Sequence, residues 1–136
     1  WSFQNSLKMQ RRLKLMQLSK SFHQHKISVK IQEIGNDLNI CIFGGDEPHI
    51  GAVALGIPIT LPHDPLTQTS SVSLMTVPGH KEDEFALRVA RQLTKQLNKV
   101  IVVSCGIHIQ DIKKEEIFQL SELLDDIINE LLSVLA

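Results

Sequence analysis

Residues 27–43 read ISVKIQEIGNDLNICIF, and this stretch decides the fold class. Its first part alternates apolar and polar residues from Ile27 to Ile31, the period of two that is typical of a half-buried strand. Gly35-Asn36-Asp37 is a tight-turn signal, and residues 38–43 resume as a second, more apolar strand. The sequence therefore predicts a β-hairpin.

The segments after the hairpin predict further strands and an amphipathic helix. Residues 50–55 and 70–77 read as strands, and the proline-containing residues 56–69 between them read as a loop. Apolar residues at i, i+4 spacing predict a helix from about residue 82 to residue 98. Residues 99–103 form a continuous apolar run, typical of an inner strand covered on both faces.

The last segment predicts a long closing helix. It begins near Asp111, a good N-cap residue, and its apolar stripe is wide enough to predict deep burial against the sheet and against a second copy of the chain. We therefore expect an α+β fold with a mixed, mostly antiparallel sheet, two C-terminal helices that cover it, and a homo-oligomer.

The N-terminal part differs in charge from the rest of the chain. Residues 1–32 carry seven Lys and Arg and no acid, and residues 4–20 read as a basic helix with a thin apolar stripe. We therefore divide the chain into a basic N-terminal helical segment, residues 1–26, and a single α+β domain, residues 27–136.

The composition argues against two classes of partner. The 136 residues have a net charge of −1 and 4% aromatic residues without tyrosine, which argues against nucleic-acid binding. No stretch approaches the ~18 consecutive apolar residues of a membrane span, so no membrane is expected. Cys41 and Cys105 lie inside apolar runs, as buried free thiols do, which suits the reducing cytoplasm.

Three histidines beside glycines are the candidate functional residues. His49 follows Gly44-Gly45, His80 follows Gly79, and His108 closely follows Gly106. Imidazole is the commonest metal ligand, and zinc held by three histidines with an open fourth position is a known arrangement. The spacing of the three histidines specifies nothing, so a shared metal site and three unrelated polar loop residues both remain open.

Two of these segments also have features that suit a phosphate. The Gly44-Gly45 backbone can form a concave anion site. The segment from His80 to Glu82 opens the predicted helix, where backbone N–H groups favour an anion and Lys81 adds a positive charge. The alternatives are that Asp46 and Glu47 are solvated turn residues and that His80 and Glu82 simply start the helix.

Three segments, in this order, carry a resemblance to one family: Gly44-Gly45-Asp46-x-Pro48-His49-Ile50-Gly51-Ala52-Val53, Gly79-His80-Lys81-Glu82 and Gly106-Ile107-His108-x-x-Asp111. Over about residues 27–135 the chain resembles the small accessory proteins of UbiD-type hydroxyarylic acid (gallate) decarboxylases, a prenylated-flavin chaperone family. That family usually has an acid directly after the position of Ile109, where this chain has Gln110.

The resemblance implies a small, cytoplasmic accessory protein, more a cofactor chaperone than an enzyme. It implies binding of reduced prenylated FMN, or FMN, and delivery to the catalytic subunit of a UbiD-type decarboxylase. It also implies a divalent metal ion, zinc or similar, and the following residues: His49, His80, His108 and Glu82 at the metal, and Gly44, Gly45 and Lys81 at the cofactor phosphate.

The residues by themselves leave two other functions open. One is a small histidine-metal-dependent hydrolase or lyase, in which the metal activates water and Glu82 acts as the general base. The other is an interaction protein whose histidines are incidental.

Overall fold

The computed structural model describes residues 2–14, 16–79 and 82–136 of the chain. Its elements are, in chain order, α1 (Phe3–Lys14), β1 (Gln17–Phe22), β2 (His25–Ile34), β3 (Asp37–Gly45), β4 (Ala52–Leu61), β5 (Asp64–Thr76), α2 (Asp83–Leu97), β6 (Ile101–His108) and α3 (Lys114–Leu135).

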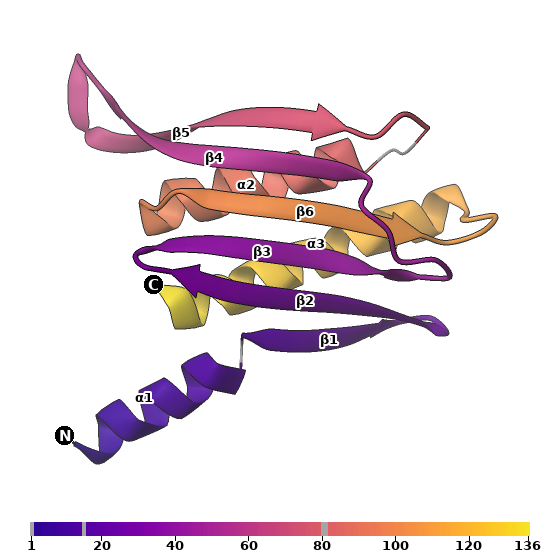
Figure 1. The fold of residues 1–136 in the computed structure, drawn as a ribbon, viewed down its shortest axis with the longest axis horizontal. Coiled ribbons are helices and arrows are strands. Elements are labelled where there is room, and N and C mark those ends of the chain that lie inside the picture. Colours follow the sequence, from indigo (N-terminus) through magenta and orange to yellow (C-terminus); the bar gives the residue numbers. More distant parts are fainter. Residues whose placement is uncertain (1, 15, 80–81) are drawn as a thin grey trace.

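The six strands form one sheet in the order β1-β2-β3-β6-β4-β5 (Figure 1). Only the central pair, β3 and β6, is parallel; the other neighbours are antiparallel. The predicted hairpin is β2–β3, and it turns at Gly35-Asn36. The prediction of a mixed, mostly antiparallel sheet is therefore confirmed.

Helices α2 and α3 lie side by side behind the sheet in Figure 1 and cover that face. The residues between the helices and the sheet are fully buried, among them Ile40, Val103 and Leu124 at 0% exposure. The prediction of an α+β fold with two covering C-terminal helices is confirmed. Among the described helices, none is long and apolar enough to cross a membrane.

Strand β6 is central, as its apolar run predicted, but the helices cover only one of its faces. Ile101, Val103 and Cys105 point to the helices and are buried. Val102 and Ser104 point to the other face and are half-buried. The expectation that both faces are covered is therefore wrong for a single chain, because the chain provides helices on one side only.

The N-terminal helix is shorter than predicted. It ends at Lys14, and residues 17–22 form the edge strand β1, which pairs with β2. The side chain of Lys20 turns to the helix side, where its Nζ lies 2.7 Å from Glu130 Oε2 of α3. The prediction of a helix over residues 4–20 is wrong for residues 17–20, because Leu18, Lys20 and Phe22 follow a period of two. The division of the chain at residue 26 stays a prediction.

The segment between the two later strands is not a loop. Strand β4 continues to Leu61, and β5 begins at Asp64, so residues 56–69 belong mostly to a long hairpin. Pro58 lies inside β4, where only β5 pairs with it, because β6 pairs with β4 no further than Gly56. Proline is tolerated at such a half-paired position, since one side of the strand needs no N–H donor.

The closing helix begins later than predicted. It starts at Lys114, and Asp111 instead has a left-handed backbone with φ 55°. The N–H group of Lys113 donates to the Glu116 carboxylate at 3.3 Å, and this bond takes the capping place that we expected for Asp111. Along α3 the apolar stripe is buried from Leu120 to Leu135, whereas Ile117 and Phe118 in the first turns are exposed.

Candidate functional site

His49 and Glu82 meet at one end of the sheet. His49 belongs to the connection between β3 and β4, and Glu82 directly precedes α2. The His49 Nε2 atom lies 2.8 Å from Glu82 Oε1. Glu82 is only 6% exposed, and its second oxygen, Oε2, is buried without a hydrogen-bond partner among the described residues. A buried carboxylate oxygen of this kind suits a cation or a protonated ligand.

Two glycines allow this contact. A Cβ atom at Gly51 would collide with the Glu82 carboxylate, and a Cβ atom at Gly106 would collide with the backbone carbonyl of His49. The connection between β3 and β4 can therefore lie directly on β6, and the carboxylate can reach the imidazole. Both glycines belong to the motifs that carry the family resemblance, but only the fold shows why each position needs a residue without a side chain.

The His49 ring is also held from its other side. Its Nδ1 atom lies 2.9 Å from the carbonyl oxygen of Glu47, a distance at which a protonated Nδ1 donates a hydrogen bond. Backbone carbonyls orient metal-binding histidines in the same way, leaving Nε2 to face the ligand. In this structure Nε2 faces Glu82.

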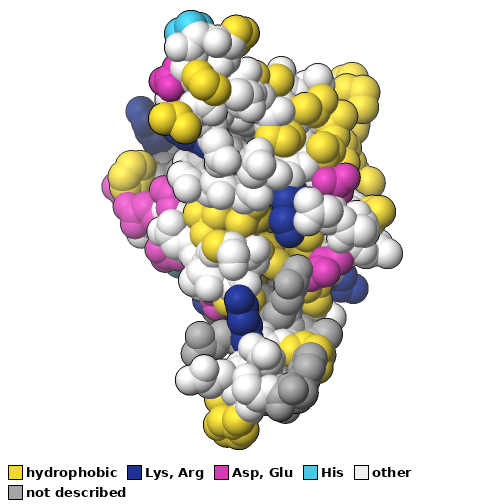
Figure 2. Space-filling view, turned by 90° about the vertical axis from the view of Figure 1, so that its left-hand side faces the viewer, with side chains coloured by type: hydrophobic (Ala, Val, Ile, Leu, Met, Phe, Trp, Pro, Cys, Tyr) yellow, Lys and Arg dark blue, Asp and Glu magenta, His cyan; other side chains and the backbone are white. Residues whose placement is uncertain are grey.

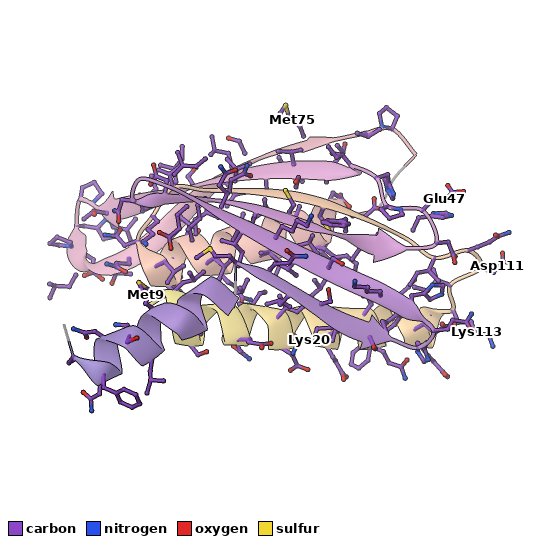
Figure 3. All side chains as sticks on the ribbon, turned by 60° about the horizontal axis from the view of Figure 1, so that its bottom comes forward. Met9, Lys20, Glu47, Met75, Asp111 and Lys113 are labelled. Atoms are coloured by element: carbon purple, nitrogen blue, oxygen red, sulfur yellow. The ribbon has the colours of Figure 1, made fainter. Side chains whose placement is uncertain are left out.

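His108, the last residue of β6, contributes an exposed imidazole to the same end. Its ring centroid lies 6.3 Å from that of His49, with the planes at 71°. Figure 3 shows Glu47 and Asp111, from the connections before β4 and after β6, at this end of the molecule. The fold therefore places His49, Glu82 and His108 at one end of the sheet, and their joint role at a metal stays a prediction.

Asp46 holds the chain around His108. Its N–H group donates to the His108 carbonyl oxygen at 2.6 Å, and its Oδ2 accepts from the Gln110 N–H group at 2.8 Å. Its other oxygen, Oδ1, lies 3.4 Å from Nδ1 of His25 on β2. Asp46 is thus a positioning residue rather than a plain solvated turn residue, and no sequence pattern pointed to His25.

The two glycines before Asp46 are needed by the sheet itself. Gly45 has a left-handed φ of 83°, and a Cβ atom there would collide with the His108 carbonyl oxygen. A Cβ atom at Gly44 would collide with the carbonyl oxygen of Lys26 on β2. Neighbouring backbone therefore accounts for both glycines, and a phosphate at Gly44-Gly45 stays a prediction.

Two of the expected site residues, His80 and Lys81, lie outside the described residues. Within residues 2–14, 16–79 and 82–136, no group of three His, Cys, Asp or Glu side chains is placed to hold a metal ion. The described donors, a buried carboxylate and two imidazoles, nevertheless have the chemistry that zinc prefers.

An apolar hollow of about 320 Å³ opens beside Glu82 and His108. It lies between the start of α2, the end of β6 and the start of α3. Glu84 and Gly79 also line it, and its apolar side chains are Phe85, Ile107, Ile109, Ile112, Ile117 and Leu120. This volume and mixture are typical of a site for a small organic ligand.

Cys105, close to this site, is not a nucleophile. Burial, together with the negative charge of Glu82, raises the pKa of its thiol to about 12, so the thiolate is not populated near neutral pH. The prediction of a buried free thiol is confirmed for Cys105 and is wrong for Cys41, which is half-buried on the uncovered face of the sheet.

Comparison with known proteins places this site in a family context. Residues 21–136 match the family described as the prenylated flavin chaperone LpdD-like domain. The chain is 28% identical over 111 residues to Protein LpdD of Lactiplantibacillus plantarum, a match that covers 80% of this chain and 76% of that protein. In fold, the chain resembles one from a chaperone complex for yeast 20S proteasome assembly, with a TM-score of 0.53, 11% identity and coverage of 88% of this chain and 97% of that one.

Proposed function

The chain belongs to the family of prenylated flavin chaperone LpdD-like domains, and on this premise we propose that it binds reduced prenylated FMN, or a related flavin, and delivers it to a UbiD-type decarboxylase. The decarboxylase partner, a homo-oligomeric state and a cytoplasmic location are parts of this proposal.

One observation carries the proposal: the His49–Glu82 contact and His108 lie at the edge of the apolar hollow. A flavin has a flat, largely apolar ring system with polar ring atoms and a charged phosphate. The hollow between α2 and α3 suits the ring system, and the imidazoles suit the polar atoms. His80 and Lys81 precede the start of α2, where a phosphate is favoured.

We include a divalent metal ion in this proposal, held by His49, His108 and Glu82 together with His80. Two observations support it: Glu82 Oε2 has no hydrogen-bond partner within the part of the chain that the structure describes, and the Glu47 carbonyl orients the His49 ring. When bound, the ion would supply positive charge for the anionic parts of the flavin. The protein residues orient these donors, and the apolar lining excludes water from the ring.

Metal analysis of the purified protein, followed by titration with zinc and with FMN, tests the proposal. We expect bound or bindable metal and a saturable flavin signal, both weakened by His108→Ala. Absence of metal and flavin affinity in the wild-type chain would contradict it. Turnover of esters or phosphoesters that disappears in His108→Ala would instead favour the hydrolase alternative.

Delivery needs its own test. Apo-decarboxylase is mixed with the flavin-loaded chain, and decarboxylation is followed over time. We expect faster activation than with the same concentration of free reduced cofactor. Equal rates with and without the chain would contradict the delivery role while leaving cofactor binding intact.

A further inference from the structure

The first turns of α3 carry two exposed apolar side chains beside the site. Ile117 is 46% and Phe118 67% exposed, whereas the apolar stripe of α3 is buried from Leu120 onward. Ile117 lines the hollow beside Glu82, but Phe118 lines a separate groove of about 650 Å³ on α3. The other residues of this groove are Lys114, Glu115, Gln119 and Glu122. A ligand in the hollow therefore covers Ile117 and leaves Phe118 exposed.

The groove next to Phe118 is held in place by the turn between β1 and β2. His23 in that turn has its Nε2 atom 2.8 Å from Oε1 of Gln119, and Figure 1 shows the turn and the start of α3 at the same end of the molecule. The His23 ring also packs edge-on against the buried Phe22, with the centroids 4.7 Å apart. A preformed surface of this kind loses little conformational freedom when it binds a partner.

The surroundings of the hollow are acidic. Residues 82–84 and 109–118, which form the start of α2 and the passage from β6 into α3, carry six acids and two lysines. Asp111 and Glu115 are exposed, and Figure 3 shows Asp111 together with Lys113 at this end. Figure 2 shows the opposite end of the molecule, where basic side chains are spread among acidic and hydrophobic ones. The start of α3 is therefore an apolar ridge in an acidic surround, which attracts a partner that is both apolar and basic.

We propose that the start of α3, centred on Phe118, is the surface on which the decarboxylase docks to receive the flavin; this inference rests on the proposed function. The hollow lies between the starts of α2 and α3, so a flavin that leaves it passes this surface, and the receiving protein must contact it. A protein that binds a phosphate-bearing cofactor places cationic groups around its own pocket. Those groups match the acids around the hollow.

Charge makes a second copy of this chain a poor occupant of the same surface. A twofold contact brings each surface against itself, so Asp111 and Glu115 would meet acids of the other copy. The ridge is also short, and small interfaces are typical of transient encounters. A carrier that leaves after it has delivered its cofactor needs an encounter of this kind.

Phe118→Ser tests the docking surface without changing the hollow. Apo-decarboxylase is activated with increasing concentrations of the chain loaded with reduced prenylated FMN. We expect Phe118→Ser to bind FMN as the wild type does, but to need at least about a 10-fold higher concentration for half-maximal activation, because it loses the apolar centre of the contact. Phe3→Ser, which removes an equally exposed phenylalanine from α1, is the matched control and should activate as the wild type does.

A charge reversal at Glu115 tests the basic character of the partner. We expect Glu115→Lys to slow activation about 10-fold at low salt and to make the rate less sensitive to added salt, because attraction at the acidic surround is weakened. Asp126→Lys reverses an exposed acid about three turns further along α3 and should change the rate less. A wild-type rate that increases with added salt would overturn the basic partner.

The same assay separates failure of this surface from failure of the proposed function. Activation by Phe118→Ser at wild-type concentrations, or equal losses in Phe118→Ser and Phe3→Ser, would overturn the docking surface and leave delivery intact. Loss of FMN affinity in Phe118→Ser would place this residue at the cofactor and would overturn its role in docking as well. If the wild-type chain activates the decarboxylase no faster than free cofactor does, the delivery role fails and this inference fails with it.

Discussion

Glu82 and His49 lie 2.8 Å apart in the folded chain, and a Cβ atom at Gly51 would not fit beside the Glu82 carboxylate. The start of α2 and the β3–β4 connection thus meet in the His49–Glu82 contact, and this contact requires a glycine at position 51. Substitutions at this contact and in its surroundings should therefore change binding and stability in separable ways.

Removing the charge of Glu82 should weaken metal binding. In Glu82→Gln the buried carboxylate becomes a neutral amide, which is a poor ligand for a divalent ion, and we expect the metal dissociation constant to rise by about 10- to 100-fold or more. Calorimetric titration with zinc measures it. Asp83→Asn, an exposed neighbour on α2, is the control and should bind as the wild type does.

Adding one methyl group at Gly51 should act through Glu82. The new Cβ atom displaces the carboxylate, so Gly51→Ala should lose metal and flavin affinity although it changes no donor. Gly56→Ala is a matched control. Its Cβ atom would collide with Thr94 on α2, the helix that Glu82 precedes, but away from the site. We expect the control to unfold at a lower temperature with its affinities unchanged; weaker binding in both variants would contradict a local effect.

Asp46 should stabilise the segment that carries His108. Asp46→Ala removes the acceptor of the Gln110 N–H group, and we expect a loss of about 1–3 kcal/mol in the free energy of unfolding, measured with denaturant, together with weaker flavin binding. Asp46→Asn keeps an acceptor oxygen and should lose less. Wild-type stability and affinity in Asp46→Ala would show that the hydrogen bond from the Gln110 N–H group to Asp46 is not needed.

The buried Cys105 should make stability fall at alkaline pH. Its pKa is raised to about 12 in the folded chain from 9.0, so between these values the unfolded state ionises and the folded state does not. The unfolded state then binds fewer protons, and the free energy of unfolding should decrease by about 1.4 kcal/mol per pH unit from this thiol. Denaturant titrations from pH 8 to pH 11 measure the slope.

The control for that slope is Cys105→Ala, which should show a smaller decrease over the same pH range. A thiol reagent at pH 8 gives an independent check, because Cys41 is half-buried and Cys105 is buried. We expect Cys41 to react in the folded chain and Cys105 only after unfolding. Equal reaction rates would contradict the burial of Cys105.

Local patterns were enough for much of the fold. The alternation in residues 27–43 predicted the β2–β3 hairpin, and the spacing of apolar residues predicted α2 and α3. Local patterns were insufficient where one segment fits both a helix and a strand, and where the pairing of a strand decides which residues it tolerates. The period of two in β1 was hidden behind a basic helical pattern, and the prolines of residues 56–69 hid a hairpin that tolerates them at a half-paired edge.

The sequence by itself determined the element types except in residues 17–22 and 56–69, because side-chain periodicity is a local property of the chain. Its three Gly-His motifs also indicated the candidate functional residues. Only the tertiary structure decided that His49 meets Glu82, that Asp46 clamps the segment of His108, and that one face of β6 stays uncovered. These are contacts between segments far apart in the sequence, and they depend on the strand order and on the close backbone approach at Gly51 and Gly106, which no local pattern specifies.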